Sequence, residues 1–124
     1  MRGFLLAVIT AAALTSSTTP PPLKVSAVNA RRYIGKWVQV TGKVVRVHSA
    51  TYKEGSPVFL NLVKHFPVCP LEVVVFADVA DHMRPAPTEL TGRTMTVTGR
   101  IQAATGAAAQ IVPDKAAALS VLPK

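Results

Sequence analysis

The chain has 124 residues and a formal net charge of +8, and 49% of its residues are apolar. This length accommodates one domain with a small core, and the scarcity of large aromatic side chains excludes a barrel with a large internal ligand cavity. The single cysteine, Cys69, excludes an internal disulfide, so stability must come from packing. The excess of basic residues favours partners that are polyanions or acidic surfaces.

The amino terminus has the organisation of an export signal. A short basic start precedes an apolar run from Phe4 to Leu14, with a small-residue cleavage motif at Ala11–Ala13 and a polar, Pro-rich linker after it. The apolar run covers about 11 residues, whereas a spanning helix needs about 20, so we expect no stable membrane insertion. We therefore predict an exported protein, periplasmic or secreted. Residues 1–22 are its signal peptide and linker, and residues 23–124 form its single domain.

The folded part opens with a short helix and a bent strand. The helix is predicted over Ala27–Tyr33, and Gly35 ends it. The segment Trp37–Val44 then alternates apolar and polar residues, which is typical of a half-buried strand. At Val45 the alternation shifts by one residue, which predicts a β-bulge that bends the strand.

Further strands and one helical turn are predicted along the rest of the chain. The second strand follows a turn-rich stretch and is expected to form a hairpin with the first. The third is a nearly continuous apolar run, which indicates cover on both faces or an exposed apolar patch. The fourth alternates without a break, and a last apolar segment either extends the sheet or covers the barrel end. In chain order these elements are Val58–Val63, Leu71–Ala77, the helical turn Val79–Arg84, Thr94–Ala103, a fifth strand Ala107–Val112 and the last segment Leu119–Leu122.

A repeat supports one small barrel. The decapeptide GKWVQVTGKV at 35–44 returns as GRTMTVTGRI at 92–101, which marks two equivalent strands. Five strands, a bent first strand and a helical segment between the third and fourth are the plan of the OB-fold, an all-β Greek-key barrel. The runs SAVNARRYIGKWVQVTGKVVRV, VFLNLVKHFP, LEVVVFADV and LTGRTMTVTGRI resemble small exported bacterial OB-fold domains described as nucleic-acid-binding or anticodon-binding-like. This resemblance covers most of the chain after the linker and implies a binding module.

Nucleic-acid binding needs a cationic groove for phosphates and flat faces on which bases stack. Outward positions of the first and fourth strands, strand ends and loops supply the cations, Lys53 among them. Phe59 and Phe76 would form a stacking platform if their faces are exposed, with Asn61 as a base-edge or sugar partner. The alternative is that both phenylalanines fill a barrel end, and Trp37 is expected in the core. The candidate nucleic-acid-binding residues are Lys36, Lys43, Arg46, His48, Phe59, Asn61, Lys64, Phe76 and Arg100.

Metal and catalytic chemistry find little support in the sequence. The spacing of His65, Cys69 and His82 matches no tight ligand pair, so we expect no metal. The six acidic residues are spread out and offer no convergent site, so we expect no cofactor and no catalysis. The leading hypothesis is a non-catalytic exported OB module that binds single-stranded nucleic acid with low sequence preference. The alternative is a cell-envelope module that binds an acidic protein or a saccharide through the apolar third strand, and a small enzyme is the third possibility.

Overall fold

The computed structural model describes residues 21–65, 68–104 and 109–123. The predicted signal peptide and most of its linker lie outside the described residues, as does the start of the predicted fifth strand. Among the described residues, no helix is both long enough and apolar enough to cross a membrane.

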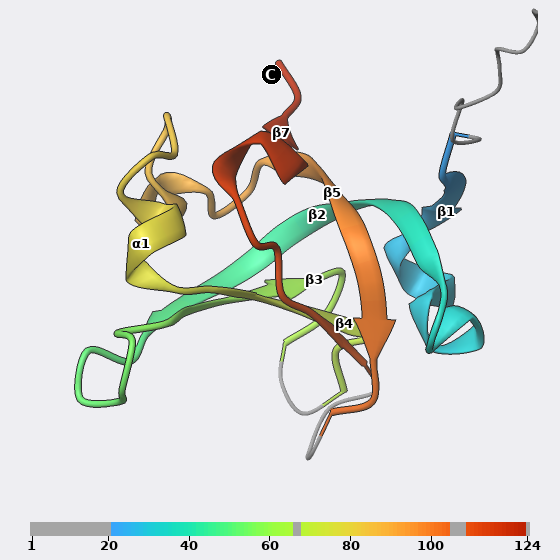
Figure 1. Ribbon diagram of the computed structural model, residues 1–124, viewed down its shortest axis with the longest axis horizontal. Coiled ribbons are helices and arrows are strands. Elements are labelled where there is room, and N and C mark those ends of the chain that lie inside the picture. The colour runs from blue at the N-terminus through green and yellow to red at the C-terminus, as the bar shows by residue number, and fades with distance from the viewer. Residues whose placement is uncertain (1–20, 66–67, 105–108, 124) are drawn as a thin grey trace, which may run out of the picture.

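Five strands form a closed barrel (Figure 1). The longest, β2 (Trp37–Ser49), pairs with β5 (Thr94–Gln102) through its first half and with β3 (Val58–Leu62) through its second. Strand β3 continues antiparallel to β4 (Leu71–Val75), which runs parallel to β6 (Gln110–Ile111). Because β6 also pairs antiparallel with β5, the sheet closes on itself. This order is that of the OB-fold and confirms the predicted all-β class.

Two further strands widen one side of the barrel. Strand β1 (Leu23–Ser26) runs parallel to β2, and β7 (Leu119–Val121) runs antiparallel to β5. Of the two alternatives for the last apolar segment, the structure therefore shows the extension of the sheet. Strand β1 was not expected from the sequence, in which the fold begins at the following helix.

The helices are short. The helix after β1 is a 3-10 helix, η2 (Ala27–Tyr33), with the predicted bounds, and Gly35 after it has a φ of 89°. The helical turn between the third and fourth barrel strands is α1 (Ala77–Ala80), which begins two residues before the predicted turn. The 3-10 turns η3 (Pro87–Glu89) and η4 (Ala116–Ala118) lie before β5 and β7.

The core follows the predicted alternation. The inward residues of β2 before the bulge, Val38, Val40 and Val44, are fully buried, as are Met95 and Val97 of β5. The pairing of β2 with β3 shifts register between Val44 and Arg46, which confirms the β-bulge. It is at this point that β2 leaves β5 and joins β3, because a bulge bends a strand and increases its twist.

Two expectations about apolar residues are settled by burial. Strand β4 is covered on both faces, since Val73, Val74 and Val75 are all buried. It is therefore unavailable as the apolar contact surface of the envelope alternative. Trp37 was expected in the core but is 54% exposed, because it lies on the outward face at the very start of β2, opposite Arg100.

Candidate nucleic-acid interface

The outward face of β2, β3, β4 and β6 carries two cross-strand rows of side chains. Residues that pair across neighbouring strands point to the same face of the sheet and form a row across the strands. The next row on that face lies two residues further along each strand, about 7 Å away. The stacking row is His48, Phe59 and Val74, and the polar row is Arg46, Asn61, Glu72 and Gln110.

A groove of about 570 Å³, the outer groove, runs over these rows. The loop between β2 and β3 forms one wall, and the residues that follow β5 form the other. The outer groove is lined by Arg46, His48, Tyr52, Lys53, Phe59, Glu72, Ala103, Ala104 and Gln110.

Aromatic and cationic side chains are layered in this groove. The rings of His48 and Phe59 are stacked, with centroids 6.1 Å apart and an interplanar angle of 23°. The Nζ of Lys53 lies 5.4 Å from the centroid of the Phe59 ring, within range of a cation–π interaction. Tyr52, in the same loop as Lys53, is 76% exposed and presents a flat face to solvent. The groove thus combines flat faces with positive charge.

One carboxylate lies among these cations. Glu72 is half-buried in the polar row, and its pKa is raised above the usual value because burial penalises the charged form. A hydrogen bond from Asn61 Nδ2 to Glu72 Oε2, 3.2 Å long, favours the charged form and opposes this rise. Electrostatic interactions with the side chains of Lys53, His48 and Arg46 act in the same direction as that bond.

Asn61 lies beneath the groove rather than in it. Its side chain is only 1% exposed, so the predicted role as a base-edge or sugar partner is excluded. Its Nδ2 also donates to the Sγ of buried Cys69, at 3.8 Å, while Oδ1 has no hydrogen-bond partner among the described residues. The pKa of the Cys69 thiol is raised by burial and by the nearby charge of Glu72. Asn61 therefore supports the site from below.

Phe76 does not line the outer groove. It is 36% exposed and packs on the tip of the β2–β3 loop, where a Cβ added to Gly55 would lie 2.7 Å from its ring. The backbone N–H of Ala77 donates to the carbonyl of Gly55 at 3.0 Å. Phe76 and its neighbour thus hold the loop that carries Tyr52 and Lys53.

The remaining predicted cations lie elsewhere. Arg100 is on the far half of the barrel, where its guanidinium donates to the carbonyl of Gly35, and Lys36 is next to that glycine. Lys43 and Lys64 are exposed at the other end of this half, where the N–H of Val63 donates to the carbonyl of Lys43. Of the nine predicted site residues, the structure brings Arg46, His48 and Phe59 together in the outer groove.

Sequence reasoning missed Tyr52, Glu72 and Gln110, and it named Lys53 only as a loop cation. Tyr52 is in a loop whose path the alternation of strands does not predict. Glu72 carried a usable signal, because it is the one charged residue within the apolar run of β4. Gln110 comes near Glu72 only through the parallel pairing of β4 with β6.

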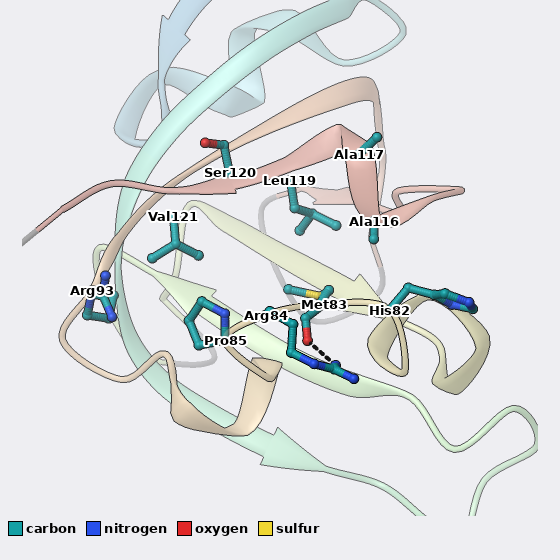
Figure 2. Close-up of a pocket in the computed structure, with 10 residues that line it drawn as sticks. All are labelled: His82, Met83, Arg84, Pro85, Arg93, Ala116, Ala117, Leu119, Ser120 and Val121. Atoms are coloured by element: carbon teal, nitrogen blue, oxygen red, sulfur yellow. Dashed lines mark hydrogen bonds between the residues drawn. The ribbon is translucent and has the colours of Figure 1, made fainter.

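A second groove, of about 500 Å³, lies between β7 and the segment after α1 (Figure 2). It contains two guanidinium groups, which are engaged with the backbone. Arg84 Nη1 donates to the carbonyls of Met83 and Asp81, at 2.6 and 3.2 Å, and Arg93 Nη2 donates to the carbonyl of Leu122 at 3.1 Å. These bonds hold the chain segments around the barrel end.

No three side chains of His, Cys, Asp or Glu come together as metal ligands within the described ranges. His65, Cys69 and His82 therefore do not form the cluster that a metal site with these ligands would need.

No family model and no curated protein matches this chain. Solved structures match at low identity. An OBody, AM1L10, bound to hen egg-white lysozyme is 18% identical with a TM-score of 0.56, over 88% of this chain and 99% of its own. The asparaginyl-tRNA synthetase of Entamoeba histolytica is 15% identical with a TM-score of 0.57, over 84% of this chain and 24% of its own. A putative aspartyl-tRNA synthetase from Leishmania major Friedlin is 11% identical with a TM-score of 0.56, over 90% of this chain and 22% of its own.

This chain thus spans about a quarter of the synthetase chains that it matches. At such identities the likeness establishes the fold alone. The chain is an OB-fold protein, a closed five-stranded barrel with additional strands, and the outer groove is its candidate binding site.

Proposed function

We propose that this protein is a non-catalytic module that binds single-stranded nucleic acid through the outer groove, with low sequence preference along most of the strand. The observation that carries the proposal is the layering of Lys53, Phe59 and His48 beside the exposed ring of Tyr52. Flat faces interleaved with cations are what an unpaired strand needs, because its bases stack while its phosphates require positive charge.

The distribution of charge in the outer groove supports binding of a nucleic-acid strand along the edge of the groove. Arg46 and Lys53 are both exposed and come from different parts of the groove, Arg46 from β2 beneath it and Lys53 from the loop that forms one wall. Phosphates at these two positions would place the intervening nucleotide over the stacking row. Base stacking tolerates every base, because each has a π-face, which accounts for low preference outside the centre of the groove.

The similar solved structures are compatible with this proposal but do not select it. They include enzymes named for tRNA and a binder of lysozyme, so the same barrel serves proteins of different kinds. Since function lies in the site rather than in the fold, the proposal rests on the chemistry of the outer groove.

A protein-binding surface is the second candidate, and one observation favours it. Four large apolar side chains near the amino-terminal end of the described chain are at least 42% exposed: Leu23, Val28, Ile34 and Trp37. Exposed apolar groups of this size are characteristic of interaction surfaces when they are contiguous. A contact of this kind would depend weakly on salt, whereas phosphate binding depends on it steeply.

We also propose that the protein acts outside the cytoplasm. The support is the basic start, apolar run and small-residue motif of the first residues, which lie outside the described part of the chain. Amino-terminal sequencing of the protein isolated from its host would test this proposal. An intact Met1 would contradict it.

The test of binding is fluorescence anisotropy of a labelled single-stranded oligonucleotide with the purified chain across a salt series. Arg46→Ala combined with Lys53→Ala removes two cations from the groove. Each phosphate contact on a single strand contributes about 0.7 to the slope of log affinity against log salt, so the double variant should flatten the slope by about 1.4.

The matched control combines Lys43→Ala with Lys64→Ala, which removes the same charge from outside the outer groove. This pair should leave the slope nearly unchanged. An equal effect of both pairs would show that attraction is diffuse rather than located in the groove. An absence of binding even at low salt would rule out the proposed function and leave the protein-binding candidate.

A further inference from the structure

A carboxylate in the middle of a basic groove needs an explanation. Glu72 lies in the polar row between Asn61 and Gln110 and lines the outer groove. A phosphate placed against it would be repelled. The group that faces Glu72 in a complex must therefore be a hydrogen-bond donor, and the phosphates must lie at the cations along the edge.

One oxygen of the carboxylate is anchored by a hydrogen bond from beneath the groove. Asn61, nearly fully buried, donates through Nδ2 to Glu72 Oε2, and the same amide nitrogen is also bonded to the Sγ of Cys69. A buried amide that is bonded on two sides cannot follow the carboxylate if it moves. The remaining lone pairs of Glu72 are thus oriented before any ligand arrives, which lowers the entropic cost of binding.

Burial leaves the charge of Glu72 incompletely compensated. The pKa of Glu72 is raised even though Asn61 and the basic side chains of Lys53, His48 and Arg46 favour its charged form. The desolvation cost therefore exceeds the stabilisation that these neighbours provide. A ligand that donates hydrogen bonds to the carboxylate would reduce this deficit. A ligand that presents an acceptor would increase it.

We propose that Glu72 selects guanine at one nucleotide of the bound strand. This inference rests on the proposed function and narrows it at a single position. Guanine presents two adjacent donors, N1–H and N2–H, on its Watson–Crick edge, and a carboxylate can accept both. Adenine and cytosine present a single amino group beside an acceptor nitrogen, and thymine and uracil present one N–H between two carbonyls. Each of these other bases therefore sets an acceptor against the carboxylate.

The rows on the sheet place the base and its edge together. The ring of Phe59 stacks with that of His48 and has Lys53 Nζ over it, so a base that takes the place of the Lys53 ammonium lies over the stacking row. The polar row begins about 7 Å further along the sheet. The edge of that base then faces the polar row, in which Glu72 lies. Gln110 lines the groove beside Glu72, and its amide can donate to the O6 of guanine.

The experiment compares oligothymidines that carry one central guanine, adenine, cytosine or inosine, or no substitution, in anisotropy titrations at low salt. The guanine strand should bind about tenfold more tightly than the adenine, cytosine and unsubstituted strands, the lower end of what a bidentate base contact gives. Inosine lacks the N2 amino group, so it should lose part of this preference.

Glu72→Gln should abolish the preference for guanine, measured as the ratio of the affinities for the guanine strand and the unsubstituted strand. Glu54→Gln is the matched control, since it removes one exposed carboxylate from the β2–β3 loop, and it should keep the preference. Equal binding of all strands by the unchanged protein, or a preference that survives Glu72→Gln, would overturn the inference and leave the proposed function intact. Failure of every strand to bind would overturn both.

Discussion

Gly42 of β2 packs closely against η2, and we expect Gly42→Ala to destabilise the protein. A Cβ added there would lie 2.6 Å from the Cβ of Ala27, which is fully buried, and 3.3 Å from Leu62 Cδ1. Carbon atoms prefer separations of about 3.5–4.0 Å, so η2 and β2 would have to separate by about 1 Å. Because Ala27 has no side-chain rotamer to change, the backbone itself must move. Overpacking of this kind costs about 2 kcal/mol, which lowers the melting temperature of a domain this size by about 10 °C.

The assay is urea unfolding followed by far-ultraviolet circular dichroism. The informative control is Ala27→Gly, which removes the methyl group that the new one meets and should itself cost about 1 kcal/mol. The double variant should be no less stable than Ala27→Gly alone, which corresponds to a coupling energy of about 2 kcal/mol. If the two single losses simply add in the double variant, the clash is not the cause and the reasoning is wrong.

Three further predictions concern the site and its supports. Because the pKa of Glu72 is raised on folding, the native state keeps a proton that the unfolded chain has released, and stability falls as pH rises from 4.5 through the native pKa. Glu72→Gln should therefore raise the free energy of unfolding at neutral pH but not below pH 4.5, and an equal gain at both would contradict this. The thiol of Cys69 is buried with a raised pKa, so iodoacetamide should modify it only after unfolding, as mass spectrometry would show, and rapid modification of the native chain would count against this. Gly55→Ala and Gly92→Ala both force alanine into a positive φ, but only the first meets Phe76, so in thermal melts it should cost about 1 kcal/mol more. Equal losses would mean that the ring moves aside freely.

Regular alternation made two of the barrel strands predictable. The inward positions of β2 and β5 follow from a period of two, and the break in that period located the bulge. Trp37 was misplaced because the general tendency of tryptophan to be buried was given more weight than its phase. It shares the outward phase of Gln39 and Thr41, so the pattern itself indicated exposure. Strand β1 was missed because four residues carry too little alternation to be recognised.

The site was less predictable than the barrel because its residues come from different strands that are adjacent only in the folded sheet. The alternation within each strand placed Arg46, His48 and Phe59 at outward positions. Alternation does not show which strands are neighbours in the folded sheet. The hairpin brings these three together, whereas Lys43 precedes the bulge and belongs to the half of β2 that pairs with β5. The bulge thus separates the cations of one strand into two groups. A bend of this kind changes the strands with which a strand pairs, and these partners cannot be inferred from the local sequence.

The division of β2 between two partners also leads us to expect an order of folding. Its second half meets β3 across a short loop, whereas its first half must wait for β5, so that Trp37 and Arg100 come together only across most of the domain. Closing such a long loop costs more entropy and slows folding. On a ribosome, the hairpin with His48 and Phe59 emerges before β5 has been synthesised. We therefore expect the contacts between β2 and β3, which carry the aromatic layer of the groove, to form early, and closure of the barrel to be the late step of folding.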